Sequence, residues 1–202
     1  TDPVSWEAPQ HQGYIGDFAQ NNLLSQIEII ELSDTHGPEG LALLNGDIYT
    51  ATREGWILKY NEASGQITKM ANTNGSPLGL VFDANGNLLI ADAYKGILSM
   101  SPAGDLTVLT NSMDGVPIVY ADDLDVTEDG KIYFSDASTK FGAEINGGTY
   151  AASLLDIAEH GGHGRLLVYD PADQSTQLVM DDLNFANGVA TAADSSFVLV
   201  NE

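Results

Sequence analysis

The chain has 202 residues, of which 7 are Lys or Arg and 29 are Asp or Glu, so its formal net charge is −22. This charge repels a phosphate backbone and an anionic lipid surface, which excludes nucleic acid and the membrane as expected partners. The chain has no cysteine, so disulfides and thiolate metal sites are excluded. The longest apolar runs, such as residues 27–32, are too short and too interrupted to span a bilayer.

Residues 1–35 are expected to form an N-terminal leader, in which prolines and a polar Gln/His stretch break any regular pattern. The leader ends in the apolar segment 23–32, which we interpret as an outer strand that closes a ring of strands. A start at Thr1-Asp2-Pro3 fits a processed, exported protein and predicts a periplasmic or secreted location. A simple boundary of the sequence explains the same start.

Four copies of one short phrase organise the rest of the chain. Each copy is followed by a polar turn and then by a buried-looking strand. The copies lie 39, 44 and 65 residues apart, and a period near forty with short strands is typical of the blades of a β-propeller. The copies are Pro38-Glu39-Gly40-Leu41, Pro77-Leu78-Gly79-Leu80, Ala121-Asp122-Asp123-Leu124 and Ala186-Asn187-Gly188-Val189.

The period predicts an all-β propeller over residues 36–202. Blade one covers residues 36–70 and blade two residues 76–110, with Asn-Gly, Asp-Gly and Pro-Ala-Asp turns between strands. Blade three begins at Tyr120, and blade four contains only two strands before Glu202. The chain is therefore expected to supply about three and a half blades.

Blade three carries an insertion over residues 142–163, between its second and third strands. Within the insertion, Leu154, Leu155 and Ala158 recur at helical spacing, which predicts a helix from Tyr150 to Glu159. Two consecutive glycines then stop the helix. The insertion is thus expected to place a short helix over the propeller.

Three and a half blades cannot close a ring, and an open ring leaves an unpaired edge. We therefore expect the propeller to be completed by its C-terminal remainder as a second chain, produced by processing after Glu202. A truncated sequence is the simpler alternative. Such a fragment would be expected to fray at its end.

Several segments resemble the strictosidine synthase-like family of six-bladed propellers. The resemblance extends from about residue 36 to the end of the chain, and it also includes the wider group of paraoxonases and gluconolactonases. It implies a six-bladed fold, of which this chain supplies a little over half. The segments that carry it are Ser76 to Leu80, Ala91-Asp92-Ala93-Tyr94-Lys95-Gly96, Asp122 to Leu124, Ile132 to Ser138, Gly164 to Pro171 and Phe185 to Glu202.

Propeller geometry brings two sets of positions to one mouth of the channel. The first strands begin there with Glu39, Leu78, Asp122 and Asn187. Carboxylate and amide oxygens are ligands that calcium prefers. The resemblance implies that Glu39, Asp122 and Asn187 would hold a calcium ion, although Leu78 interrupts the set and the Asp-Asp pair departs from the family's frequent Asn-Asp. Acidic side chains at these places also cap turns, which is the alternative for Asp123 and Asp136.

The loops after the second strands return to the same mouth, and they supply the candidate catalytic residues Asp92, Asp136 and Glu202. His36 directly precedes the first phrase and is a candidate general base, since histidine titrates near neutral pH. An exposed loop histidine is the alternative for His36. The sequence has no Gly-x-Ser-x-Gly elbow and no His-Glu-x-x-His motif.

Three functions remain open on these residues. The first is hydrolysis of an ester, lactone or amide, with calcium polarising the carbonyl and activating water. The second, implied by the resemblance, is condensation of an amine with an aldehyde, whose catalytic glutamate lies in a later blade of the family. The third is a non-enzymatic binding platform for which an uncharged channel would be expected. The acidic mouth favours a small-molecule hydrolase.

The position of Glu202 adds a sharper form of the hydrolase hypothesis. In members of the resembled family the equivalent glutamate is commonly followed by threonine. Cleavage between the two would give the following chain an N-terminal threonine, whose own amine could act as the base. An incidental nick in a loop is the alternative.

Overall fold

The computed structural model describes residues 7, 9–32 and 34–202, and the chain divides into two units, Thr1–Glu31 and Leu32–Glu202. Within residues 9–31 the first unit has one regular element, the short 3₁₀ helix η1 (Gly16–Phe18). Residues 23–32 form no strand in this structure, and their ring-closing role stays a prediction. Across the described residues, no helix has the length and apolar character needed to traverse a bilayer.

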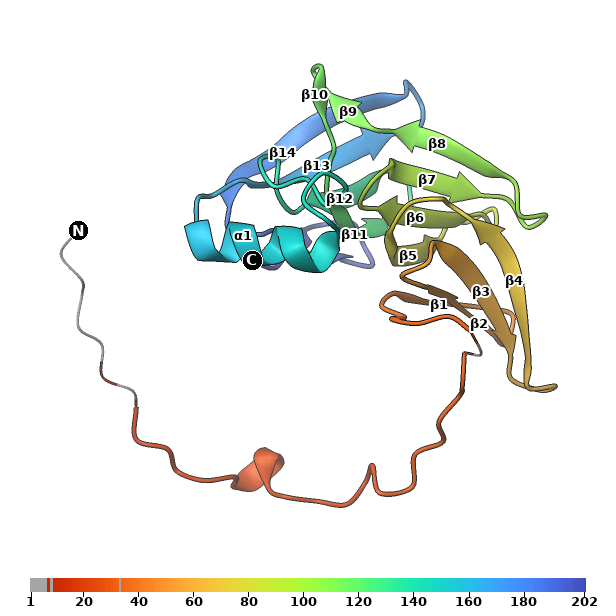
Figure 1. Cartoon of the computed structure of the whole chain (residues 1–202), viewed down its shortest axis with the longest axis vertical. Helices are drawn as coiled ribbons and strands as arrows, with labels where there is room; N and C mark the ends of the chain where they lie inside the picture. Colours follow the sequence, from red (N-terminus) through yellow and green to blue (C-terminus); the bar gives the residue numbers. More distant parts are fainter. Residues whose placement is uncertain (1–6, 8, 33) are drawn as a thin grey trace. The chain divides into compact units, whose positions relative to one another are not determined.

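The second unit is a β-propeller, as predicted, with three full blades and two strands of a fourth. Figure 1 shows the three four-stranded sheets as a fan, with the last strand of each sheet on the outside. The first strands of successive blades contact one another at the inside. The strands are β1 (Leu41–Leu44), β2 (Asp47–Ala51), β3 (Trp56–Asn61) and β4 (Gln66–Asn72) in blade one; β5 (Pro77–Phe82), β6 (Leu88–Asp92), β7 (Gly96–Met100) and β8 (Leu106–Thr110) in blade two; β11 (Ala121–Val126), β12 (Ile132–Asp136), β13 (Gly164–Asp170) and β14 (Ser175–Leu183) in blade three; and β15 (Val189–Thr191) and β16 (Val198–Val200) in blade four.

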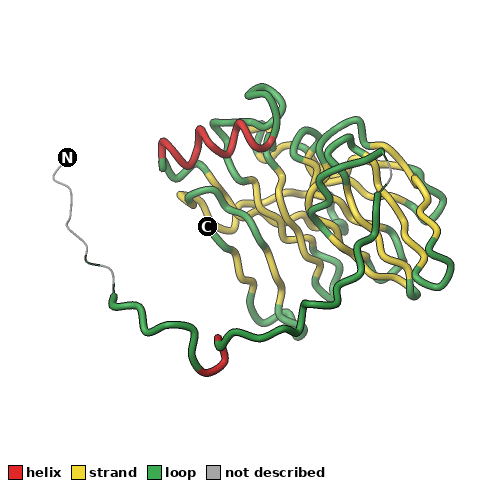
Figure 2. The backbone as a smooth tube through the Cα atoms, turned by 60° about the horizontal axis from the view of Figure 1, so that its bottom comes forward, coloured by secondary structure: helices red, strands yellow, loops and turns green. Residues whose placement is uncertain are grey.

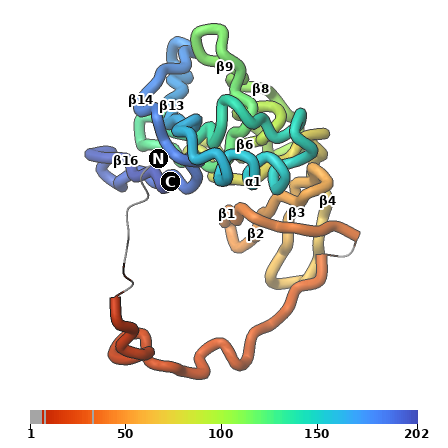
Figure 3. The backbone as a smooth tube through the Cα atoms, turned by 60° about the vertical axis from the view of Figure 1, so that its left-hand side comes forward, coloured from red at the N-terminus to blue at the C-terminus, as the bar shows by residue number. Residues whose placement is uncertain are grey.

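All neighbouring strands within a blade are antiparallel and follow the order of the chain. Tight turns make this meander possible. Between β1 and β2, Asn45 and Gly46 both have positive φ (53° and 82°), the two-residue geometry that matches the twist of a hairpin. In Figure 3, β1 and β16 lie at the two ends of the series of blades.

One hairpin was not predicted. Strands β9 (Ser112–Met113) and β10 (Val116–Pro117) pair with each other in the connection from blade two to blade three. Their turn is Asp114-Gly115, with φ of 50° and 79°. An Asp-Gly pair is a strong hairpin signal, so the sequence did carry the information.

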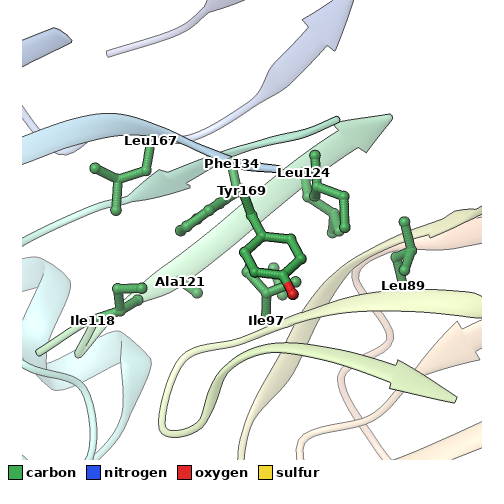
Figure 4. Close-up of a cluster of buried hydrophobic side chains, with 10 residues drawn as sticks. Leu89, Ile97, Ile118, Ala121, Leu124, Phe134, Leu167 and Tyr169 are labelled. Atoms are coloured by element: carbon green, nitrogen blue, oxygen red, sulfur yellow. The ribbon is translucent and has the colours of Figure 1, made fainter. Parts of the chain in front are cut away.

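The hydrophobic core lies between neighbouring blades rather than inside each sheet. In the cluster of Figure 4, Leu89 and Ile97 of blade two meet Leu124, Phe134 and other side chains of blade three. Phe134 and Ile97 are fully buried. Since each blade buries one face against the next, the blades stabilise one another, and the strand ends at the mouth are held in fixed relative positions.

The predicted insertion helix is confirmed as α1 (Thr149–Glu159). Figure 2 shows it at one end of the strands. Ala152 on its buried face packs against Ala143 and against Ala137 in the loop after β12. The helix ends at His160, which takes the left-handed conformation and donates its N–H to the carbonyl of Asp156. The insertion therefore covers the mouth side of blade three.

Candidate functional site

The strand register shows that the four phrase positions are structurally equivalent. Each position lies two residues before an equivalent residue of the first strand, which pairs with an equivalent residue of the second strand. These pairs are Leu41 with Thr50, Leu80 with Ile90, Leu124 with Phe134 and Val189 with Val200. Because the first strands are neighbours, these four positions approach one another at the inside of the fan. They are Glu39, Leu78, Asp122 and Asn187.

Asp122 and Asn187 are brought together across blades three and four. The amide Nδ2 of Asn187 donates to Oδ2 of Asp122 at 3.2 Å. Asp122 is only 4% exposed. Burial, followed by the negative charges of Glu39 and Asp123, raises the pKa of Asp122 to about 8. The carboxyl group of Asp122 is thus held where ionisation is costly unless a cation is present.

Glu39 belongs to the same electrostatic group. Its side chain is reached by solvent in this chain, but the surrounding protein still desolvates the carboxyl. That desolvation and then the charge of Asp123 raise the pKa of Glu39. Leu78 is buried in the same hydrophobic cluster as Tyr120, so it fills the second place of the set with apolar surface, as the sequence indicated.

Asp123 also belongs to the acidic group formed by Glu39 and Asp122. From the sequence it was considered as a turn cap. The other three repeats have glycine at its place, Gly40, Gly79 and Gly188. Its Oδ2 accepts the N–H of Val189 at 2.9 Å, so it links blade three to blade four. A Cβ on Gly79 would lie 2.5 Å from Asp123 Oδ1, which shows how closely this carboxylate fits. The signal in the sequence was a charged residue at a repeat position that is glycine in the other three copies.

The donor set fits calcium in kind. All the side chains here offer oxygen, and carboxylates whose ionisation is disfavoured gain most from a bound cation. Within residues 7, 9–32 and 34–202, however, no three His, Asp or Glu side chains are close enough to hold a metal ion by themselves. A calcium site at this mouth therefore needs the Asn187 amide, or groups from outside this chain.

A second set of carboxylates has a repeated structural role. In every blade, one carboxylate at the end of the second strand or just after it accepts a backbone N–H from the segment before the first strand. The pairs are Glu54 with His36 N (3.0 Å), Asp92 with Ser76 N (3.0 Å), Asp136 with Tyr120 N (2.9 Å) and Glu202 with Asn184 N (2.8 Å). Each contact holds the start of its blade against the end of the second strand.

This role corrects the catalytic assignment of Asp92 and Asp136. Both residues are fully buried, and so neither faces a substrate at the mouth. The second oxygen of Asp136 accepts Arg165 Nε at 2.9 Å and pairs with Arg165 Nη2 at 2.8 Å. Burial raises the pKa of Asp136, and the Arg165 guanidinium opposes that rise. We assign both aspartates to the folding of their blades.

His36 and Glu202 remain at the surface. His36 Nδ1 lies 2.9 Å from Glu54 Oε1, and its side chain is 76% exposed. Its hydrogen bond with Glu54 engages the imidazole, and its role as a general base stays a prediction. Glu202 is exposed and lines a cavity together with Asn187 and residues of α1. Its catalytic role also stays a prediction.

The mouth also contains a cavity of about 320 Å³ beside Glu39 and Leu78. Its other walls include Arg53, Tyr94 and the first turn of α1. Tyr120 donates its hydroxyl to the Thr149 carbonyl at 2.8 Å and so fixes that turn over the mouth. Space for a small molecule therefore adjoins the acidic group.

The fold and this site define a β-propeller protein with an acidic channel mouth. The chain belongs to the strictosidine synthase-like family. The family model described as "Strictosidine synthase" matches residues 122–202, and the model "Strictosidine synthase-like, N-terminal" matches residues 16–60. The second match includes much of the leader, which lay outside the resemblance seen in the sequence.

Individual relatives agree with this assignment. The chain is 34% identical over 195 residues to "Protein STRICTOSIDINE SYNTHASE-LIKE 6" of Arabidopsis thaliana, covering 93% of this chain and 51% of the relative. The chain thus spans about half the length of the curated relatives that it matches.

Two solved structures share the fold. A gluconolactonase from Xanthomonas campestris matches with a TM-score of 0.66 and 20% identity, over 82% of this chain and 54% of the other. The calcium-binding protein regucalcin from Agrobacterium tumefaciens matches with a TM-score of 0.59 and 16% identity, over 81% and 50%. At these identities the likeness shows the fold alone.

Proposed function

We propose that this protein is a calcium-dependent hydrolase that opens an ester, lactone or amide bond at the channel mouth. The observation that carries the proposal is the convergence of Glu39, Asp122 and Asn187 from the first strands of three blades. The Asn187 amide and the Asp122 carboxylate are in contact, and burial followed by neighbouring carboxylates raises the pKa values of Asp122 and Glu39. Strongly perturbed acids beside a cavity favour a functional site over a structural one.

The residues of this chain would act first as ligands. Glu39, Asp122 and Asn187 would hold the ion through oxygen atoms, and the Asp123 carboxylate would keep β11 and β15 in place around them. When bound, calcium supplies the positive charge that polarises a substrate carbonyl and makes water more acidic. The cavity beside Glu39 would hold the rest of the substrate against Tyr94 and α1.

The names of the two structural neighbours support this choice, since one is a gluconolactonase and the other is called calcium-binding. The chain spans about half of its curated relatives, so the whole protein's activity also depends on residues outside it. Self-cleavage after Glu202, completion of the ring by a second chain, and export from the cytoplasm stay predictions. Amine–aldehyde condensation and a pure binding role are the alternatives that the experiment must separate.

The experiment uses the protein as it is naturally expressed. Calcium binding is measured by isothermal titration calorimetry, and hydrolysis is measured on a lactone, an aryl ester and an amide, with and without EGTA. We expect Glu39→Gln and Asp122→Asn to lose calcium binding and hydrolysis together. Asp181→Asn is the matched control, because Asp181 is exposed on β14 and makes no side-chain hydrogen bond within the described residues.

Two outcomes would contradict the proposal. One is hydrolysis that continues in EGTA and in both variants. The other is calcium binding without turnover of any of the three substrate types, which would favour the binding role. Condensation of an amine with an aldehyde, without hydrolysis, would favour the alternative activity.

A further inference from the structure

An arginine side chain at the mouth has no partner, although the chain has 29 Asp and Glu residues. Of the seven Lys and Arg side chains, five form an ion pair with a carboxylate, whereas Arg53 and Lys95 form none within the described residues. The guanidinium of Arg53 has five N–H donors, and none of them makes a hydrogen bond in this part of the chain. The paired cations are Lys59, Lys69, Lys131, Lys140 and Arg165.

The carboxylate that is nearest to Arg53 in the sequence is engaged elsewhere. Glu54 follows Arg53 directly, but its Oε2 accepts the N–H of His36 at 3.0 Å and its Oε1 pairs with His36 Nδ1 at 2.9 Å. The backbone of Arg53 is also fixed, because its N–H donates to the carbonyl of His36 at 2.9 Å. The guanidinium is therefore free of its neighbour, while the backbone that carries it is anchored.

Arg53 lines the cavity of about 320 Å³ beside Glu39. Both charged side chains contribute to its wall, and no ion pair joins these two described residues. The hydroxyl of Tyr94, also in the wall, makes no hydrogen bond within the described residues, and the first turn of α1 adds no acidic side chain. Leu78 supplies apolar surface in the same wall. The cavity therefore offers a positive charge and hydrogen-bond donors in addition to the acidic Glu39.

We propose that Arg53 binds a carboxylate group of the small molecule that occupies this cavity. The planar guanidinium fork matches a carboxylate with two parallel hydrogen bonds. A phosphate monoester carries more negative charge than one guanidinium offsets, and Glu39 in the same wall would repel it more strongly. As a substrate subsite this rests on the proposed function, and it narrows that function to esters, lactones or amides that also carry a carboxylate.

The test compares benzoate with benzamide, which has nearly the same shape and no charge, by isothermal titration calorimetry on the naturally expressed protein. EGTA is present throughout, so that benzoate cannot owe its binding to calcium. We expect the wild type to bind benzoate more tightly than benzamide. Arg53→Met should weaken benzoate binding by about ten-fold, the lower end for a hydrogen bond between charged groups, because Arg53 is exposed to water. Benzamide binding should change by less than about two-fold.

Lys95→Met is the matched control. It removes the other unpaired positive charge, from a residue that does not line the cavity, so it should change the affinity for either ligand by less than about two-fold. Arg53→Lys keeps the charge without the fork, and it should retain part of the preference for benzoate. All three variants should keep the unfolding temperature of the wild type, because neither side chain makes an ion pair within the described residues.

Hydrolysis of phenyl hydrogen succinate and of phenyl acetate tests the role in a substrate subsite. Arg53→Met should raise the KM for the anionic ester by about ten-fold and leave kcat/KM for the neutral ester within about two-fold of the wild type. The proposal is overturned if the wild type does not prefer benzoate, if Arg53→Met keeps the preference, or if Lys95→Met removes it as fully. Absence of hydrolysis would count only against the proposed function, because benzoate binding is measured without turnover and without calcium.

Discussion

Replacing Asp122 with Asn should stabilise the calcium-free protein at neutral and alkaline pH. In the folded chain the pKa of Asp122 is raised from its ordinary value of 3.8 to about 8. Between these two values the folded state holds a proton that the unfolded state has lost. The free energy of unfolding therefore falls as pH rises, with a slope of up to about 1.4 kcal/mol per pH unit.

The magnitude follows from that window. From about pH 5 to about pH 8 the free energy of unfolding of the wild type should fall by roughly 3 to 4 kcal/mol relative to that of Asp122→Asn, which has no proton to lose at this position. Below about pH 4 the pH dependence of the free energy of unfolding should differ little between the two proteins at this position. Saturating calcium should largely remove the pH dependence of the wild type, because a bound cation stabilises the ionised carboxylate.

The assay is urea denaturation in EGTA across this pH range, followed by intrinsic fluorescence. Asp181→Asn is the control, because it removes one negative charge, as Asp122→Asn does, but from an exposed position. The reasoning would be refuted if the wild type and Asp122→Asn kept a constant difference in stability from pH 5 to pH 8. It would also be refuted if Asp181→Asn reproduced the effect, since the cause would then be the overall charge.

Three further substitutions test other parts of the structure. Arg165→Met should cost about 3 to 5 kcal/mol in chemical denaturation, because it leaves the buried Asp136 without its cation, and adding Asp136→Leu should recover much of that loss. Gly79→Ala should weaken calcium binding in calorimetry by displacing the Asp123 carboxylate, and unchanged affinity would show that Asp123 does not position the site. Phe134→Ala should cost about 3 to 5 kcal/mol and lower the unfolding temperature, and a loss below about 1 kcal/mol would mean that the blades do not share this core.

The repeat made much of the fold and part of the site predictable. Once Glu39, Asp122 and Asn187 are recognised as one position in three repeats, propeller geometry alone places them together. The helix in the insertion was predictable for a similar reason, because its apolar residues follow a helical period. The regular features of the chain were thus accessible from spacing.

The remainder depends on pairings that spacing does not encode. Asp136 was interpreted as catalytic, since nothing in the sequence shows that it opposes Arg165 across 29 residues and an inserted helix. Asp156 lies on the buried face of an otherwise ordinary amphipathic helix, where a carboxylate is expected to face solvent. Burial decides the role of both residues, and burial follows from tertiary packing.

The contacts between β11 and β15 have a consequence for how the protein folds. Asp123 Oδ2 accepts the N–H of Val189, and two residues further along Asp125 Oδ2 accepts the N–H and the hydroxyl of Thr191. A completed third blade therefore presents two ready acceptors, at the spacing of alternate strand residues, to the segment made next. During synthesis the third blade thus offers a template for the fourth, so this long-range pairing does not wait for the whole chain.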